Sequence, residues 1–297
     1  MGFQFKRGEG VPRSVRRVVT EQLDYAAAQL RGADPGNRDE AVHEARKSIK
    51  KVRAIIRLTY RELGPIGTSA NSLLRELARK LSPFRDADVM VETLDTLKND
   101  LNPRLLAQVR PRFLRERSKV ARSPLPPAVP FALDRISERV RTWPLHITGF
   151  AALEPGLART LQRGRKAFES ARKSPSAEAF HEWRKRVKDL WYHVRLLEGL
   201  WTESIRAYER NLKELETALG DDHNLALLRE RLAIAGNTLE LMSLFAAIDR
   251  RQAALRACAL EPGDRLYGQK PAEFVDQVRQ SWEAWQRPVK KSEASAA

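Results

Sequence analysis

Two short segments of the sequence concentrate side chains that bind anions. From His43 the chain reads His-Glu-Ala-Arg-Lys-Ser-Ile-Lys, and from His181 it reads His-Glu-Trp-Arg-Lys-Arg-Val-Lys. Arginine forks and lysine ammonium groups hold anionic oxygens through charge-assisted hydrogen bonds, and a protonated imidazole adds two more donors. Both segments therefore indicate recognition of a negatively charged ligand.

Helical geometry gathers these basic residues on one side of each segment. At about 100° per residue, the basic positions from His43 to Arg57 fall within an arc of about 120°. The apolar residues form a separate stripe on another face of the helix. The second segment divides in the same way. The predicted packing stripes are Ala45, Ile49, Val52 and Ile56 in the first segment, and Trp183, Val187, Leu190 and Val194 in the second.

A helix that stacks like charges on one face loses about 0.2–0.5 kcal/mol per pair. Glu44 and Glu182 lie toward the other side of their helices, and we expect them to neutralise the basic face poorly. The arrangement therefore favours an anion, or carboxylates from another element, opposite the basic face. A plain solvated surface is the alternative, and the recurrence of the pattern makes it less attractive.

The two segments belong to an internal repeat with an offset of 138 residues. Seven residue pairs are identical between 42–58 and 180–196, and the same offset aligns Leu81-Ser82-Pro83-Phe84-Arg85-Asp86 with Leu219-Gly220-Asp221-Asp222-His223-Asn224. Two separate segments with one offset indicate duplication of a larger unit. Arg75 and Lys213 are also paired by this offset.

The elements that must position these residues are helices. Apolar residues recur at helical spacing along the chain, with proline and glycine between the runs, and strand patterns are nearly absent. An all-α fold is expected, with a first half at about 11–143, a second half at about 144–286 and a disordered tail at 287–297. The expected helices are 12–31, 38–63, 68–98 with a break near Pro83, 102–120, 128–143, 150–172, 176–200, 203–219, 222–235, 237–259 and 271–286.

Composition narrows the classes of ligand and of site. The chain has 297 residues, with 54 Lys and Arg against 38 Asp and Glu, and a net charge of +16. This balance favours nucleic acid, an anionic surface or a phosphate-rich ligand. The single cysteine, Cys258, excludes a disulfide framework and a cysteine-based zinc cluster, and we expect it to be buried. No targeting segment or membrane helix is evident, so a cytoplasmic protein is predicted.

Taken together, these motifs resemble those of the CHAD (conserved histidine α-helical domain) family. The histidine-containing helices match its first motif in each half, and the segments from Leu81 and from Leu219 match its second. Leu266-Tyr267 through Pro271, followed by Trp282 and Trp285, resemble its carboxy-terminal helix. The resemblance covers about residues 11–286, and it implies a stand-alone member that lacks the CYTH domain found in some relatives.

The resemblance implies two four-helix bundles related by a pseudo-two-fold axis, with basic helices from both halves around a central cavity. It also implies inorganic polyphosphate as the ligand and a link to polyphosphate granules. The expected polyphosphate-binding residues are His43, Arg46, Lys47, Lys50, Arg53, Arg57, Arg75 and Arg85, followed by His181, Arg184, Lys185, Lys188, Tyr192, Arg195, Lys213 and His223.

This sequence departs from a symmetric repeat. Lys51 and Arg53 of the first copy correspond to Asp189 and Trp191 of the second. We therefore expect the two halves to contribute unequally to binding.

The expected function is binding without catalysis, and with no cofactor or metal. The chain has no HExxH motif, no Walker-type glycine-rich loop and no Gly-x-Ser-x-Gly elbow. Two alternatives stay open: a basic helical protein that binds nucleic acid, and a phosphohydrolase acting on polyphosphate or nucleotides. Docking on anionic membranes or granules without membrane insertion is compatible with the leading interpretation.

Overall fold

The structure is a computed structural model that describes residues 2–34, 36–200, 203–234 and 239–287. Within these ranges the chain forms helices and no strand. The α-helices are α1 (Val11–Arg31), α2 (Arg38–Leu58), α3 (Tyr60–Lys80), α4 (Ser82–Thr96), α5 (Pro103–Arg122), α6 (Ala128–Arg139), α7 (Glu154–Lys173), α8 (Ala177–Leu196), α9 (Glu203–Ala233), α10 (Leu239–Gly268) and α11 (Pro271–Gln286), and the short 3-10 turns are η1 (Val140–Thr142), η2 (Phe150–Ala152) and η3 (Glu198–Leu200).

The all-α prediction is confirmed, with differences in the bounds of the helices. In the first half the helix predicted at 38–63 ends at Leu58, and α3 begins at Tyr60 rather than at residue 68. The sequence predicted two helices at 203–219 and 222–235, but α9 runs through Gly220 as one helix. Likewise α10 continues past Pro262 to Gly268, beyond the predicted end at residue 259. In the first half the expected break near Pro83 does separate α3 from α4.

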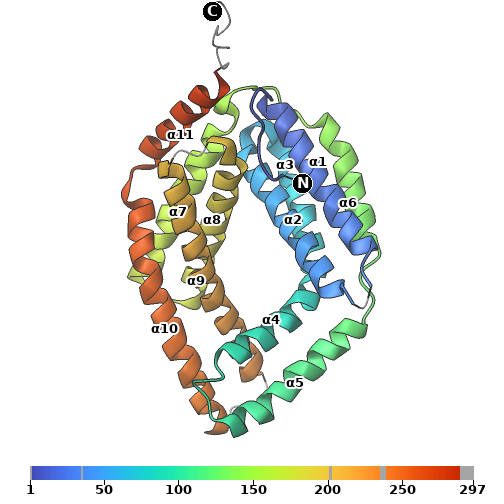
Figure 1. The fold of residues 1–297 in the computed structure, drawn as a ribbon, viewed down its shortest axis with the longest axis vertical. Coiled ribbons are helices and arrows are strands. Elements are labelled where there is room, and N and C mark those ends of the chain that lie inside the picture. The colour runs from blue at the N-terminus through green and yellow to red at the C-terminus, as the bar shows by residue number, and fades with distance from the viewer. Residues whose placement is uncertain (1, 35, 201–202, 235–238, 288–297) are drawn as a thin grey trace, which may run out of the picture.

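Helices α2 and α8 lie at the centre of the ribbon, with α1 and α3 packed against α2 and with α7 and α9 packed against α8 (Figure 1). Helix α6 lies outside, against α1, and α10 lies outside, against α9. Both predicted packing stripes are confirmed, since all eight residues are at most 3% exposed. The two central helices also touch directly: the buried His193 ring of α8 donates from Nε2 to the Ala54 carbonyl of α2 at 2.9 Å. Burial lowers the pKa of His193 to about 4, so the ring is neutral.

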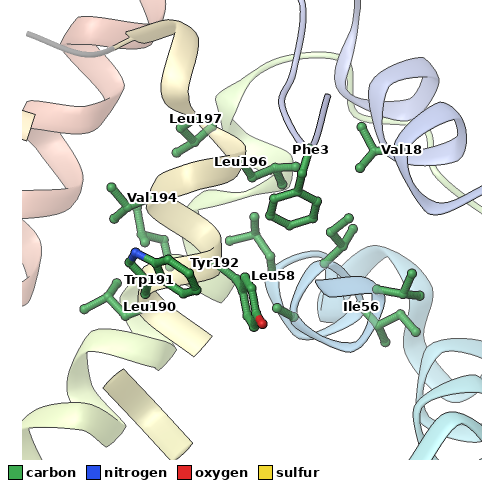
Figure 2. Close-up of a cluster of buried hydrophobic side chains, with 14 of the residues drawn as sticks. Phe3, Val18, Ile56, Leu58, Leu190, Trp191, Tyr192, Val194, Leu196 and Leu197 are labelled. Carbon is green, nitrogen blue, oxygen red and sulfur yellow. The ribbon is translucent and has the colours of Figure 1, made fainter. Parts of the chain in front are cut away.

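The buried apolar side chains form two clusters. The larger one joins α1, α2, α3 and α6 to α7, α8, α11 and the adjoining parts of α9 and α10. Figure 2 shows its centre, where Leu58 of α2 meets Tyr192 and Leu196 of α8. The smaller one is built from α4, α5, the C-terminal part of α9 and the N-terminal part of α10. Helices of both halves therefore share each cluster.

Two glycines are required by the backbone of this arrangement, one for a close contact and one for a positive φ. A Cβ at Gly156, near the start of α7, would lie 1.8 Å from the carbonyl oxygen of Leu58, so only glycine lets the two backbones meet there. Gly64 has a φ of 49° and precedes Pro65, which produces the kink inside α3. Both positions lie where the two halves meet or the chain turns.

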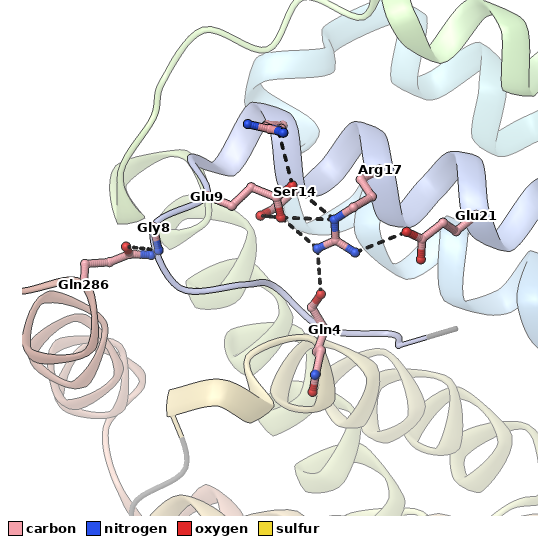
Figure 3. A network of polar contacts seen from close by, with 8 residues as sticks. Gln4, Gly8, Glu9, Ser14, Arg17, Glu21 and Gln286 are labelled. Atoms are coloured by element: carbon pink, nitrogen blue, oxygen red, sulfur yellow. Dashed lines mark hydrogen bonds and ion pairs between the residues drawn. The ribbon is translucent and has the colours of Figure 1, made fainter. Parts of the chain in front are cut away.

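The N-terminal segment crosses from α1 to α8 and α11. Phe3 and Phe5 are buried, and the Phe5 amide donates to the Leu196 carbonyl at 2.9 Å. Figure 3 shows Arg17 of α1 holding this segment through the Glu9 carboxylate at 2.7 Å and the Gln4 carbonyl at 3.1 Å. The hydrogen bonds from Arg17 lower the pKa of Glu9, so this anchor is present at neutral pH.

Some sequence predictions have other outcomes. The prediction that Cys258 is buried is wrong: it lies on an exposed face of α10. The division near residue 143, the duplication and the cavity stay predictions, although α2 and α8 correspond closely at the offset of 138 residues. Most of the tail predicted to be disordered, 288–297, lies outside the described residues. Across the described ranges, no helix combines the length and the apolar character needed to cross a membrane.

Candidate anion-binding site

Four cationic side chains from the two central helices form what we call the central cluster: Arg46 and Lys50 of α2, and Arg184 and Lys188 of α8. Their proximity is seen in the electrostatics, because burial lowers the pKa of Lys50 well below its usual value and Lys188, Arg46 and Arg184 lower it further. Burial also lowers the pKa of Arg46, Arg184 and Lys188. The fold thus concentrates partly desolvated positive charge from both halves.

The two cations of α2 are held differently. Arg46 donates from Nη1 to the Ala78 carbonyl at 2.6 Å and to the Ser82 hydroxyl at 2.7 Å. Lys50 has no hydrogen bond or ion pair to any residue that the structure describes. Nearby carboxylates exist, since Lys50 lowers the pKa of Asp86, whose own pKa burial raises. The Lys50 amino group therefore has no bound partner among the described residues.

On α8 the lysine is the neutralised cation. Lys188 donates to Oε1 of Glu216 on α9 at 2.7 Å, and Lys213 donates to Oε2 of the same carboxylate at 3.1 Å. Glu216 is buried, which alone would raise its pKa, but the two lysines and Arg184 lower it to about 2. Glu216 is thus ionised and serves as an internal counter-ion on this side of the cluster.

Arg184 is the second cation without a partner. Its Nε is buried and makes no hydrogen bond within the described parts of the chain. Beside it, the His181 ring stacks on His223 of α9, with centroids 4.1 Å apart and planes at 30°. Burial, Arg184 and His181 lower the pKa of His223 to about 3, and burial with nearby Lys185 lowers that of His181. Both rings are neutral at pH 7 and gain protons readily only if an anion arrives.

In the first half, the residues equivalent to the histidine pair are His43 and Arg85. His43 is exposed near the start of α2, and burial together with the Arg85 charge lowers its pKa. Arg85 is held by Glu92 through two hydrogen bonds of 3.1 and 3.0 Å. This end of α2 is more open than its counterpart on α8.

Two predicted lysines point away from the cluster. Lys47 pairs with Glu44 at 2.8 Å, and Lys185 pairs with Glu182, in each case three residues apart on one helix. The expectation that the two glutamates neutralise poorly is therefore wrong for these lysines. A lysine side chain is long and flexible enough to swing toward a carboxylate one turn away.

Three predicted arginines lie toward the other end of α2 and on α3. Arg53 donates to Oδ1 of Asn71 at 3.0 Å, and burial with the adjacent Arg57 lowers its pKa to about 10. Arg57 shares the same acceptor at 3.2 Å and pairs with Asp189 of α8. Arg75 is exposed and has only a long contact of 3.5 Å to the Ser72 hydroxyl.

Three further predicted residues contact Trp191, and one of them, Lys213, also donates to Glu216 beside the central cluster. The Arg195 guanidinium lies 5.2 Å and the Lys213 ammonium 5.0 Å from its ring centroid, and the indole donates to Glu209 at 2.7 Å. Tyr192 is buried against Trp191, and burial raises the pKa of its hydroxyl. The cation–π contacts hold these side chains in place.

Sequence reasoning missed two residues that shape the electrostatics. Glu216 neutralises Lys188. The repeat could have revealed this residue, because the offset of 138 residues pairs Glu216 with Ala78, so only the second copy has a carboxylate at this position. Lys51 is partly buried 5.2 Å from the Phe3 ring, and burial with Lys47 and Arg195 lowers its pKa to about 8. No sequence signal placed the N-terminal segment there.

The chemistry available is recognition of anions. Side chains with unpartnered amino, guanidinium and imidazole nitrogens come together from α2, α8 and α9, and these groups can supply several donors to an anion. Among the side chains that the structure describes, no three His, Cys, Asp or Glu are grouped to hold a metal ion.

This helical fold and its basic cluster define an all-α protein with the side chains of an anion-binding domain. The family model for the CHAD domain matches residues 18–233, and the chain belongs to that family. Among solved structures, the chain is similar to the crystal structure of the CHAD domain from the plant Ricinus communis, with a TM-score of 0.57 and 20% identity over 95% of this chain and 94% of that one. No curated protein sequence matched this chain.

Proposed function

We propose that this protein binds inorganic polyphosphate through the central cluster and does not act on it chemically. The observation that carries the proposal is the convergence of Arg46, Lys50, Arg184 and Lys188 from two helices, with Lys50 and Arg184 left without internal partners. The resemblance to the CHAD family supports the choice of polyphosphate among polyanions.

Polyphosphate suits these side chains because it offers closely spaced charges and no bases. An internal phosphate carries about one negative charge, so ammonium and guanidinium groups are the appropriate partners. Binding releases condensed counter-ions, and affinity is expected to fall steeply with salt, as it does for nucleic acids. A bound polyanion also raises the pKa of Lys50, His181 and His223, so complex formation takes up protons.

The test is a competition titration of labelled long-chain polyphosphate against duplex DNA, single-stranded RNA and ATP at two salt concentrations. It compares the wild type with Lys50→Ala/Arg184→Ala, which removes both unpartnered cations. The matched control is Arg135→Ala/Lys173→Ala, which removes the same charges from exposed positions on α6 and α7. We expect at least about a tenfold loss of polyphosphate affinity in the first variant and less than about twofold in the second.

Two outcomes overturn the proposal. Equal losses in both variants mean that net charge, rather than the cluster, governs binding. Equal competition by DNA or RNA identifies a nucleic-acid-binding or general polyanion-binding protein. A separate assay of phosphate release with Mg²⁺ tests the absence of catalysis, and cluster-dependent release identifies a phosphohydrolase instead.

The proposal extends to a cytoplasmic location with association with polyphosphate granules through the same cluster. Fluorescent fusions of the wild type and of Lys50→Ala/Arg184→Ala in cells that accumulate polyphosphate provide the test. We expect the wild type to gather at granules and the variant to spread evenly. Granule association that persists in the variant assigns it to another surface.

A further inference from the structure

A second basic site lies apart from the central cluster. A pocket of about 340 Å³ opens between α2, α3, α7 and α8, and four arginines line it: Arg57, Arg159, Arg163 and Arg186. Asp189 is the one acidic residue among the described residues of its lining. Four positive charges against one leave this small volume strongly positive, although none of the four cations of the central cluster belongs to it.

The arginines of the pocket are not all satisfied by the protein. Arg57 pairs with Asp189, and Arg186 pairs with Glu182 beside the pocket. Arg159 lies 4.5 Å from the Tyr60 ring centroid, a contact that positions the guanidinium without neutralising it.

Arg163 of α7 is an arginine of the pocket without a partner. It has no hydrogen bond or ion pair to any residue within the described ranges, and Arg186 and Arg159 both repel it. Burial and these two charges lower its pKa. Its guanidinium is therefore free to donate to a ligand in the pocket.

The equivalent positions in the other half of the repeat are built differently. Shifting all the lining residues by 138 residues leads to three basic residues and three acidic ones, so the formal charges at those positions balance. The basic residues are Lys51, Arg195 and Arg206, and the acidic ones are Glu21, Glu198 and Glu209.

That region is also covered. The N-terminal segment lies over it, with Phe3 against Lys51 and Tyr192 and with the Gln4 carbonyl bound by Arg17 (Figures 2 and 3). One side of the crossing of α2 and α8 is thus neutral and closed by the chain itself, whereas the other is positive and open. Helix packing alone does not require this difference, because the same two helices form both sides.

We propose that the open pocket binds a compact phosphate anion, of the size of pyrophosphate or tripolyphosphate, at a site separate from the central cluster. The ligand supplies negative charge beside Arg163 and Arg159, which have no ion pair with any described residue, and the Thr68 hydroxyl and Asn71 amide of α3 also line the pocket. The pocket volume of about 340 Å³ has room for a few phosphate groups. This inference stands whether or not the central cluster binds long polyphosphate.

Calorimetric titration of the full chain with pyrophosphate, tripolyphosphate and ATP tests the proposal. Arg163→Gln removes the unpartnered guanidinium without breaking a hydrogen bond or ion pair to a described residue, and we expect it to weaken binding of the short anions at least about fivefold. Lys166→Gln is the matched control, because it removes one charge from an exposed position of the same helix outside the pocket. We expect it to bind as the wild type does. Thermal unfolding of each variant confirms that it is folded.

The central-cluster variant Lys50→Ala/Arg184→Ala distinguishes this site from the first. Retention of tripolyphosphate binding in that variant, with loss in Arg163→Gln, supports two sites. Equal affinity for ATP and tripolyphosphate identifies the triphosphate group as the feature recognised, and weaker binding of ATP indicates a free oligophosphate. The proposal is overturned if the short anions do not bind at millimolar concentration, if Arg163→Gln binds them normally, or if only the central variant loses them.

Discussion

The two copies of the basic helix handle their lysines in opposite ways. Lys188 on α8 is neutralised by Glu216 at 2.7 Å, whereas Lys50, its equivalent on α2, has no partner among the described residues. The difference lies on the next helix: the position equivalent to Glu216 is Ala78, which has no charge to offer. One substitution between copies thus determines which lysine is free.

The arginines show the reverse assignment. The Nε of both arginines is buried without a partner, but Arg46 of α2 donates from Nη1 to the Ala78 carbonyl and the Ser82 hydroxyl, whereas Arg184 on α8 makes no hydrogen bond or ion pair with any described residue. Gly220 occupies the position equivalent to Ser82 and brings no hydroxyl. Each of the two helices therefore contributes one cation that has a partner and one that has none within the described residues.

The largest effect is expected from making the second copy like the first with Glu216→Ala. The pKa of Glu216 is lowered to about 2, which corresponds to about 3 kcal/mol of stability at pH 7 that is lost as the pH falls toward 2. The variant leaves Lys188 buried among like charges, so we expect chemical denaturation to show a loss of about that size. Polyphosphate affinity should rise, because a carboxylate has left the cluster. Glu214→Ala, at an exposed position of the same helix, is the control, and a similar loss there contradicts the assignment.

The converse change, Ala78→Glu, gives the first copy the counter-ion of the second. A carboxylate beside Lys50 competes with the ligand, and we expect polyphosphate affinity to fall about tenfold. Ala78→Gln has a similar shape without the charge and should bind nearly as the wild type does. Equal losses in both variants attribute the effect to packing instead.

Acidification should reveal the difference between the histidine pair of α8 and α9 and the His43–Arg85 pair. The pKa of His223 is about 3 when folded and about 6.5 when unfolded, so the unfolded chain binds an extra proton between these values. The contribution of His223 to the stability of the folded protein is therefore complete above pH 6.5 and declines as the pH falls toward 3. Between pH 7.5 and 5.5, we expect His223→Gln to lose about 1 kcal/mol less stability than the wild type. His146→Gln, at an exposed site, should follow the wild type, and an identical slope in all three proteins rules out this role for His223.

The smallest effects are expected from exchanging Ser82 and Gly220. Ser82→Gly removes an acceptor 2.7 Å from Arg46 and should cost about 1 kcal/mol of unfolding free energy. Gly220→Ser should gain about 0.5–1 kcal/mol, since it restricts the unfolded chain and offers Arg184 a hydroxyl. The site has room, because a Cβ there lies 3.7 Å from Nε of Arg184. Thermal melts of the two variants should therefore shift in opposite directions, and shifts of the same sign contradict the comparison.

Helical periodicity predicted much of the candidate site because it depends on local geometry. The spacing of three and four residues put Arg46 and Lys50 on one face of α2 and the apolar stripe on another, and the buried residues agree. The same reasoning was less successful for Lys47 and Lys185, which pair with Glu44 and Glu182 instead of joining the other cations. A lysine side chain is flexible, so its direction depends on side-chain contacts and not only on its position along the helix. The periodicity of α2 likewise grouped Arg57 with His43, although Arg57 lines the separate pocket.

The sequence by itself determined the all-α class, the basic character, the repeat offset and the two helices that carry the cations, because each follows from composition or from residue spacing along one helix. Only the tertiary structure decided which cations remain without partners, since Lys50, Arg184 and Arg163 depend on what α3, α8 and α9 bring beside them. It also decided that the N-terminal segment covers one side of the central crossing and leaves the other open. Such contacts join residues far apart in the chain, and their energies depend on distance and burial, which no spacing along the sequence records.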